Sequence, residues 1–211
     1  MAKSEATETT NMRDRILAVA TELFSAKGFE GVSIRNIANE VGVKLPTLYY
    51  YFKDKRDLYE EVESTAYGEA RDRLKKVLHL SGTPEERLRK FLEELISILD
   101  KDIRFYRLVQ RNLLESDQEN REFLVKNGLQ ALFDGLKDVI GALDTKTNAD
   151  IATMGILATV IGFIGLKGGA HFLDNYKYAK KPTKANQAMV DAILYTLEYL
   201  PKKDHSDSAA P

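Results

Sequence analysis

Hydroxyl groups and cations concentrate in one short segment, residues 44–56, which reads KLPTLYYYFKDKR. Three consecutive tyrosines and one threonine supply the hydroxyls, and four basic residues accompany one acid, a local charge of 4 − 1 = +3. Such groups form hydrogen bonds and ion pairs with phosphates, and apolar contacts with base edges. The segment therefore predicts a binding surface for duplex DNA rather than a place where covalent bonds are broken.

A helical wheel at about 100° per residue separates the segment into two faces. Leu48 and Phe52 fall on one face, whereas Thr47 and Tyr50 point away from it. We expect the apolar pair to pack into the core, and Thr47 and Tyr50 to reach base edges and thymine methyls. For Tyr49, a purely structural packing role is an equal alternative to a DNA contact. The residues able to reach phosphate oxygens are Lys44, Tyr49, Tyr51, Lys53 and Lys55.

Helical periodicity on both sides of this segment predicts an all-α fold that begins with a three-helix helix-turn-helix domain. An apolar stripe from Ile16 to Phe24 indicates a first helix that ends at Gly28. Ser33 is placed to cap a second, short helix that ends at Gly42, and Pro46 lies in the first turn of a third. This order of helix, short helix, glycine turn and short helix is that of a helix-turn-helix motif.

The start of the second helix offers another contact point for DNA. Ser33 and Arg35 lie where unpaired N–H groups and the helix dipole favour a phosphate. A fourth helix is expected to begin at Asp54, with Asp57 at the capping-box position, and to run towards Leu80. That helix connects the motif with a second domain.

Beyond Thr83 the spacing of apolar residues predicts a bundle of further helices, about nine in the whole chain. We expect residues 11–57 to form the DNA-binding domain and residues 58–201 a ligand-binding and dimerisation domain. Residues 1–10 and 202–211 are polar and are expected to be disordered tails. The predicted helices of the bundle are Glu85–Leu99, Asp102–Glu115, Gln118–Leu143, Asn148–Leu173 and Thr183–Leu200.

The last two of these helices carry apolar residues on more than one face. A protomer of this size covers one apolar face of a terminal helix more easily than two, so we expect these helices to pair across a homodimer. The alternative is an internal core that merely tolerates the glycines. The expected interface residues are Ala158, Gly162, Gly165, Gly169, Met189, Ala192, Thr196 and Tyr199.

The overall composition is that of a soluble globular protein. The chain of 211 residues is 44% hydrophobic and 30% charged, and its net charge of −1 provides no global attraction to nucleic acid. The absence of cysteine fits a cytoplasmic location. The uncharged run Ile151–Leu166 is shorter than the roughly 18 residues of a membrane span. We expect it to be a buried helix and expect no membrane partner.

No catalytic chemistry is predicted from the sequence. There is no cysteine nucleophile, and His79, His171 and His205 lack the spacing of metal ligands. The segment GFIGLKGGAH matches neither a phosphate-binding loop nor a dinucleotide turn. We therefore expect no enzyme, no catalytic or metal site and no cofactor.

Residues 12–58 resemble the DNA-binding domain of the TetR family of bacterial transcriptional regulators. Four motifs carry the resemblance at the expected spacings: A-x-x-L-F-x-x-K-G-F, S-I-R-x-I-A, V-G-V and T-L-Y-Y-Y-F-K-x-K. The resemblance implies a helical homodimer whose two helix-turn-helix units sit in successive major grooves. It also implies a second domain that binds a small ligand.

Three positions depart from the family's pattern. Where such proteins often carry a serine cap and a polar or glycine pair, this chain has Lys44, Leu45 and Pro46. Loss of a capping side chain is expected to weaken the start of the recognition helix by about 0.5 to 2 kcal/mol, which Pro46 partly offsets. The DNA-facing positions that the resemblance implies are Ser33, Arg35, Lys44, Leu45, Pro46, Thr47, Tyr49, Tyr50, Tyr51 and Lys55.

The second domain has no comparably specific motif, so its ligand is inferred from residues that could line a pocket. Their aromatic and aliphatic character suggests a small, mainly apolar organic effector. An ordinary place in the core is the alternative for each residue. The candidates are Tyr67, Phe91, Phe105, Tyr106, Val109, Leu113, Phe163, Leu166 and His171.

Together these features predict a ligand-responsive transcriptional repressor. We expect it to bind a near-palindromic operator as a homodimer and to be released by its effector. The alternative is a helical small-molecule-binding or adaptor protein that has lost specific DNA binding, which the near-neutral charge and the altered KLP segment leave open. Salt dependence and the ratio of specific to non-specific affinity distinguish the two.

Overall fold

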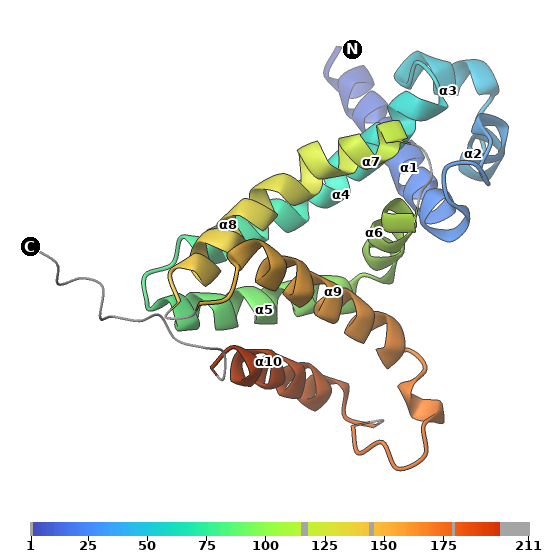
Figure 1. Cartoon of the computed structure of the whole chain (residues 1–211). Coiled ribbons are helices and arrows are strands. Elements are labelled where there is room, and N and C mark those ends of the chain that lie inside the picture. Colours follow the sequence, from blue (N-terminus) through green and yellow to red (C-terminus); the bar gives the residue numbers. More distant parts are fainter. Residues whose placement is uncertain (1, 115–117, 144–145, 179, 199–211) are drawn as a thin grey trace, which may run out of the picture. The chain divides into compact units, whose positions relative to one another are not determined.

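A computed structural model describes residues 2–114, 118–143, 146–178 and 180–198 of the chain (Figure 1). Every regular element in these ranges is a helix, which confirms the predicted all-α class. The predicted tail 202–211 lies outside the described residues. The first helix begins at Ala2, whereas the sequence predicts a loose segment up to residue 10. Alanine and glutamate in this segment have high helix propensity.

Packing groups the chain into two compact units. Unit 1 comprises residues 1–69 and 102–128, and unit 2 comprises residues 70–101 and 129–211. These two units are defined by which residues pack together. The predicted division into a DNA-binding domain and a ligand-binding domain is instead defined by what each part binds. The functional boundary at residue 57 therefore stays a proposal.

Unit 1 consists of the helix-turn-helix elements and two later helices that pack with them. The helix α4 (Lys55–Leu78) begins in unit 1 and continues into unit 2. The other elements of unit 1 are α1 (Ala2–Lys27), α2 (Ile34–Val41), α3 (Leu45–Tyr51), α6 (Ile103–Leu114), α7 (Gln118–Leu124) and the π-helical turn η1 (Val125–Leu129).

Unit 2 is built around α5 (Pro84–Lys101), whose apolar stripe is buried against the remaining helices. The other elements are α8 (Gln130–Gly141), α9 (Ala149–Lys167), the 3₁₀ turn η2 (Ala170–Phe172) and α10 (Pro182–Glu198).

The predicted caps of the short helices are confirmed. Ser33 and Asn36 form a capping box: the Ser33 hydroxyl accepts the Asn36 N–H at 3.1 Å, and the Asn36 side chain accepts the Ser33 N–H at 3.1 Å. Gly42 ends α2 with φ of 79°, a left-handed conformation that glycine adopts without strain. Lys44 precedes α3 without a side-chain capping bond, as the altered segment predicts.

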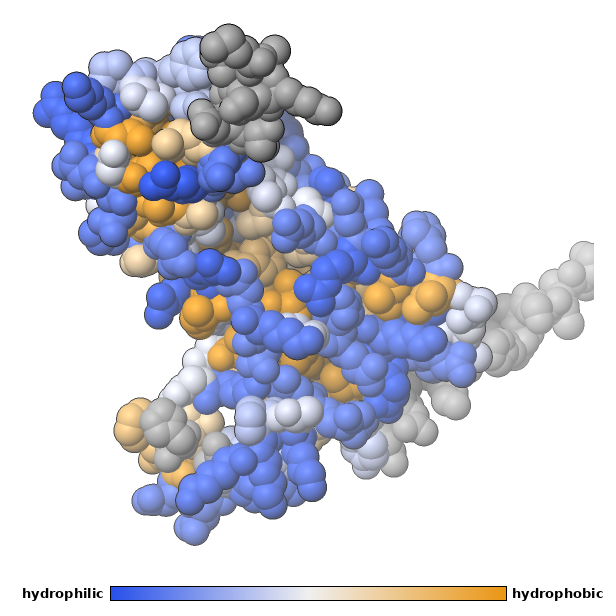
Figure 2. Space-filling model, turned by 180° about the vertical axis from the view of Figure 1, so that it is seen from behind, coloured by the Kyte–Doolittle hydropathy of each residue, from blue (hydrophilic) through white to orange (hydrophobic). Residues whose placement is uncertain are grey.

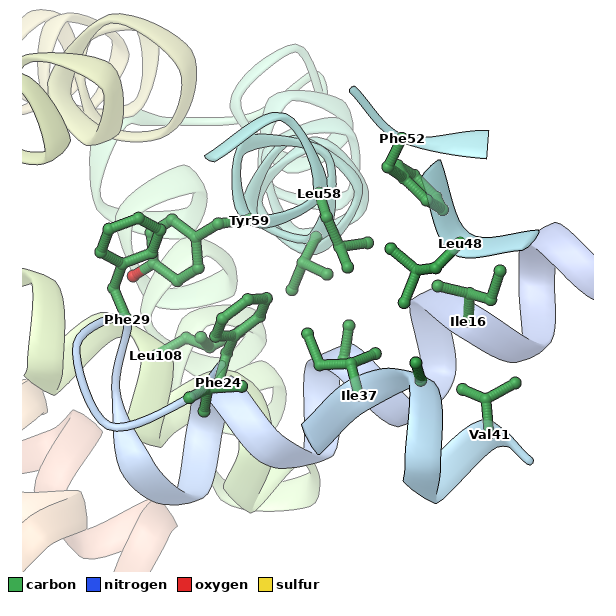
Figure 3. Close-up of a cluster of buried hydrophobic side chains, with 14 residues drawn as sticks. Ile16, Phe24, Phe29, Ile37, Val41, Leu48, Phe52, Leu58, Tyr59 and Leu108 are labelled. Atoms are coloured by element: carbon green, nitrogen blue, oxygen red, sulfur yellow. The ribbon is translucent and has the colours of Figure 1, made fainter. Parts of the chain in front are cut away.

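The core of unit 1 fixes the orientation of the short helices (Figure 3). Leu48 and Phe52 are almost completely buried, as the helical wheel predicts. The rings of Phe24 and Phe29 stack at 6.3 Å across the turn after α1. The fully or nearly fully buried residues that converge in Figure 3 include Ile16, Ile37, Val41, Leu58, Tyr59 and Leu108. This packing leaves the opposite face of α3 free for another partner.

The predicted helix from Gln118 to Leu143 is interrupted by the π-helical turn η1. Gly128 lies in this turn and is buried against Tyr67: a Cβ atom at Gly128 would lie only 3.0 Å from Cγ of the tyrosine ring. Close approach of the ring to the backbone therefore favours glycine here. Periodicity alone predicts one continuous helix because the apolar spacing persists through the turn.

The predicted helix from Asn148 to Leu173 ends earlier, at Lys167. Gly168 and Gly169 follow, and glycine lowers helix stability by about 1 kcal/mol per residue. The last turn is also fixed from outside, since the Lys167 ammonium lies 2.7 Å from both carboxylate oxygens of Asp100 and 2.8 Å from Oδ1 of Asn186. These contacts join the ends of α5, α9 and α10 within unit 2.

The expectation that α9 is buried nearly all round is wrong for the single protomer. Only Thr153, Ile156, Val160 and Ile164 are buried, and the apolar residues exposed on α9 are Ile151, Met154 and Leu166. On the face seen in Figure 2, apolar surface interrupts the polar covering in several places.

At 19 residues with a mean hydropathy of 1.9, α9 is also long and apolar enough to cross a membrane, a test that core helices of soluble proteins pass too. Its length therefore does not exclude a span, contrary to the sequence-based expectation.

Candidate nucleic-acid interface

The helix α3 presents one face to the core and the other to solvent. Tyr50 is 77% exposed and Tyr49 48% exposed, whereas Leu48 between Thr47 and Tyr49 is completely buried. The rings of Tyr50 and Tyr51 meet edge to face at 5.0 Å, which restricts the rotamers of Tyr50. An exposed, oriented tyrosine on a rigid helix can enter a groove with little loss of side-chain entropy.

The start of α2 opens onto a hollow of about 420 Å³. It brings together three predicted phosphate ligands from three helices: Ser33 at the start of α2, Tyr49 on α3 and Lys55 on α4. A helix start, a phenol and an ammonium are all favourable partners for a phosphate. The full lining is Glu30, Gly31, Val32, Ser33, Ile34, Asn36, Tyr49 and Lys55.

Lys55 is held in place by an aromatic ring. Its ammonium nitrogen lies 4.0 Å from the centre of the Phe29 ring, a cation–π contact. Phe29 in turn lies 5.0 Å from the buried ring of Tyr59. The position of this cation therefore depends on the core of unit 1.

The other predicted DNA ligands differ in exposure. Arg35, Lys44, Pro46 and Lys53 are exposed, while Thr47 is half-buried. Leu45 and Tyr51 are also half-buried and pack against the hydrophobic core of unit 1. The Leu45 side chain therefore contributes to the core of unit 1. Its contact with DNA stays a prediction.

Replacing Lys55 by alanine is expected to weaken binding to every duplex by a similar factor. A phosphate contact carries no sequence information, so the slope of log affinity against log salt should fall by about 1 in magnitude for each protomer bound. The measurement is fluorescence anisotropy with labelled duplex at several salt concentrations. Lys90→Ala, at an exposed lysine of α5, is the charge-matched control. An unchanged salt slope in Lys55→Ala would remove Lys55 from the interface.

The predicted ligand-lining residues fall on both units. In unit 1, the rings of Tyr67 and Phe105 meet edge to face at 5.5 Å, and Tyr106 and Val109 are buried nearby on α6, whereas Leu113 is 47% exposed. In unit 2, Phe91 is buried, Phe163 half-buried and Leu166 exposed. The side chain of His171 lies outside the described part of the chain. A shared lining stays a prediction.

Two polar residues next to Tyr67 were missed by sequence reasoning. Glu63 on α4 and Asn112 on α6 are both completely buried. The Asn112 amide donates to Oε1 of Glu63 and, at 2.8 Å, to the Tyr67 hydroxyl, while the Tyr59 hydroxyl donates to Asn112 Oδ1 at 2.7 Å. An available signal was the position of Glu63, four residues after one buried tyrosine and four before another.

Burial changes the acid-base behaviour of this polar cluster, which we define as Tyr59, Glu63, Tyr67 and Asn112. Desolvation raises the pKa of Glu63 to about 7, and the hydrogen bond from Asn112 and the nearby Tyr59 hydroxyl offset part of the rise. Burial and the nearby Glu63 charge also raise the pKa of Tyr67. Glu63 can therefore exchange a proton near neutral pH, while Tyr67 remains a neutral phenol.

Comparisons with known proteins agree with this geometry. The sequence profile of the family described as "Bacterial regulatory proteins, tetR family" matches residues 16–62, which include α2, α3 and the start of α4. The regulator IcaR of Staphylococcus aureus strain Newman, a negative transcriptional regulator of a biofilm operon, is 32% identical over 96 residues. That match covers 45% of this chain and 52% of IcaR, so the chain spans about half the length of this relative. The activator FasR of Mycolicibacterium smegmatis is 26% identical over 163 residues, 77% of this chain and 73% of FasR.

Solved structures share the fold. A TetR-family regulatory protein from Rhodococcus RHA1 has a TM-score of 0.72 at 16% identity and covers 92% of this chain and 98% of its own. The regulator FadR from Bacillus subtilis, solved in complex with stearoyl-CoA, has a TM-score of 0.66 at 20% identity and covers 87% and 96%. At such identities these likenesses establish the fold alone.

The fold and the exposed face of α3 define a helix-turn-helix protein. With the four sequence motifs and the matching profile, the chain belongs to the TetR family of bacterial regulatory proteins.

Proposed function

We propose that the protein is a ligand-responsive transcriptional repressor that acts in the cytoplasm. In this proposal it binds a near-palindromic operator as a homodimer and is released by a small, mainly apolar effector. The proposal rests mainly on the two faces of α3: Leu48 is completely buried on one, and Tyr50 is exposed on the other. The negative regulator IcaR, which is 32% identical over 96 residues, supports the direction of control. Both curated relatives are regulators of transcription, and we propose no enzymatic activity.

The second copy of the chain is proposed to cover the exposed faces of α9 and α10. Ala158, Gly162, Gly165 and Gly169 are all exposed in the protomer, as are Ala192 and Thr196 on α10, while Met189 is half-buried. Tyr199 lies outside the described residues. Small residues allow two helix backbones to approach closely, and the exposed apolar side chains beside them gain from burial. We propose that a second copy of the chain covers these faces rather than a lipid bilayer. The solved structures that share this fold are those of transcriptional regulators.

Replacing Gly162 by arginine is expected to convert the dimer into a monomer without harming the protomer. Apart from the neighbouring residues and the backbone of its own helix, no described atom lies within 4 Å of a Cβ at Gly162, so the new side chain meets open space in the single chain. A long cation at a two-fold helix pair would instead be forced against the partner. Molar mass from light scattering measures the result. Gly141→Arg, where a Cβ also meets open space, should stay dimeric; a dimeric Gly162→Arg would contradict the interface.

The effector is proposed to act through α4. This helix runs without interruption from Lys55, at the hollow beside α2, to Leu78 in unit 2. An effector that binds better to a conformer with altered spacing of the two DNA-reading helices must weaken DNA binding by the same factor by which DNA weakens effector binding. The apolar acyl chain of the FadR ligand shows what one protein of this fold accommodates.

Selection of bound sites from random duplex DNA tests the proposed function. We expect the protein to enrich a near-palindrome whose half-sites are spaced by one helical turn, roughly 34 to 36 Å, or a multiple of it. The enriched site then serves to screen metabolites for release. Failure of the folded dimer to enrich any sequence would contradict a repressor and favour the adaptor protein that binds only a small molecule.

A further inference from the structure

The polar cluster of unit 1 contains a carboxylate oxygen whose bonding is incomplete. Glu63 Oε1 accepts from the Asn112 amide, whereas Glu63 Oε2 is buried without a hydrogen-bond partner among the residues that the structure describes. Leaving a buried charged acceptor unpaired costs several times more than a neutral hydrogen bond contributes. An arrangement of this kind is favourable when a donor from outside the chain completes it.

The groups around Oε2 determine the chemistry of that donor. Tyr59 and Tyr67 lie one helical turn before and after Glu63 on the same face of α4, and Phe105 packs edge to face on Tyr67. Aromatic rings beside a carboxylate favour a cation over a neutral donor. An ammonium has three donors and no acceptor, which matches one carboxylate oxygen and two phenol oxygens.

We propose that Glu63, Tyr59 and Tyr67 form a binding site for an organic ammonium group carried by the effector. The proposal rests on the proposed function and specifies its ligand as a mainly apolar molecule with one protonated amine. Asn112 currently supplies the N–H that Glu63 accepts. An ammonium that donates to Oε2 and to the Tyr67 oxygen competes with this amide, which also donates to Tyr67, so that binding and the rearrangement of Asn112 occur together.

A chain of contacts connects the ammonium site with the DNA-binding hollow inside unit 1. Asn112 accepts the hydroxyl proton of Tyr59, the Tyr59 ring lies 5.0 Å from Phe29, and Phe29 carries the Lys55 ammonium at 4.0 Å. Displacement of Asn112 therefore breaks one of the contacts that orient Tyr59. The expected consequence is a shift of Lys55 away from its phosphate-binding position.

The charged groups that face Glu63 act in opposite directions. Glu60 disfavours the ionised form of Glu63, whereas Arg56, the Asn112 amide and the nearby Tyr59 hydroxyl favour it. An ammonium adds a second favourable charge. Binding of an amine should therefore require ionised Glu63 and weaken as the pH falls below about 7, by up to about tenfold per pH unit.

Matched probes on one skeleton test the site in the full-length protein. Phenylalkylamines with one to six methylenes are compared with the alcohol and the carboxylate of the same length by isothermal titration calorimetry at pH 8. We expect saturable binding of at least one amine and at least about 30-fold weaker binding of its alcohol and carboxylate. Glu63→Gln should lose the preference for the amine, whereas Glu69→Gln, at an exposed carboxylate of the same helix, should keep it.

Three results would overturn the site. These are the absence of amine binding by the folded wild-type protein across the series, equal amine affinity in Glu63→Gln, and an amine affinity that does not change between pH 5.5 and pH 8. Asn112→Ala provides a second variant, because it removes the amide that competes with the amine. This variant is expected to bind the amine more tightly, but its DNA affinity should no longer change when the amine binds.

Measuring DNA affinity with and without the amine distinguishes failure of the ammonium site from failure of the proposed function. The bound amine is expected to weaken binding to the selected duplex at least about tenfold in the wild-type protein and not in Glu63→Gln. Specific DNA binding that no amine alters would overturn the ammonium site and leave the regulator intact. Failure to select any DNA sequence would instead overturn the proposed function, whatever the amines do.

Discussion

Replacing Leu48 by alanine is expected to lower the free energy of unfolding by about 2 to 5 kcal/mol, because the side chain is completely buried between α3 and the core of unit 1. The lost contacts include those that hold the recognition helix α3 against α2, so DNA binding should be lost together with stability. Urea denaturation followed by circular dichroism at a fixed protomer concentration measures the change.

Tyr50→Ala is the matched control for that variant. Tyr50 lies two residues away on the opposite face of the same helix and is 77% exposed, so its removal should change the unfolding free energy by no more than about 0.5 kcal/mol. The two variants thus separate loss of fold from loss of a contact. Equal destabilisation by both would show that the two faces of α3 are not divided in this way.

Protein stability is expected to fall as the pH rises from about 4.5 through 7, because of Glu63. Its pKa is about 7 in the folded protein against a usual value of 4.5, so the folded state retains a proton that the unfolded state releases. The contribution of the protonated group is therefore complete below about pH 4.5 and lost above pH 7. The full difference corresponds to about 3 kcal/mol. Denaturation by urea at pH 5 and pH 8 measures it.

Glu63→Gln should remove most of this pH dependence. The variant is neutral at both pH values, so it should match the wild-type protein near pH 5 and exceed its stability at pH 8. Glu69→Gln, which replaces an exposed carboxylate of α4, should leave the dependence unchanged. Identical pH profiles for Glu63→Gln and the wild-type protein would show that Glu63 does not hold a proton near neutrality.

The helix-turn-helix could be predicted from the sequence because its determinants are local. Ser33 and Gly42 limit α2 through their own backbone geometry, and the wheel position of Leu48 against Tyr50 follows from helical periodicity. Each of these features depends on residues no more than a few positions away. The structure therefore reproduces them in detail.

The features that could not be predicted depend on contacts distant in sequence. Glu63 and Asn112 are 49 residues apart, and neither residue alone signals a buried hydrogen-bonded pair. The π-helical turn at Gly128 is explained by the ring of Tyr67 that lies against it. The contacts that hold the last turn of α9 join Lys167 to Asp100 and Asn186. Periodicity reports which face is apolar and contains no information on these partners.

Specific DNA recognition by α3 is tested most directly by the ratio of two affinities, one for the selected duplex and one for an unrelated duplex of equal length. At physiological salt we predict a ratio of at least about 10³ for the wild-type protein. Tyr50→Ala should reduce this ratio by about 10- to 100-fold, since a base contact contributes about 1 to 3 kcal/mol of discrimination, whereas Lys55→Ala should weaken both affinities and preserve it. A wild-type ratio near 1, or a ratio that Tyr50→Ala leaves unchanged, would contradict recognition through the exposed face of α3.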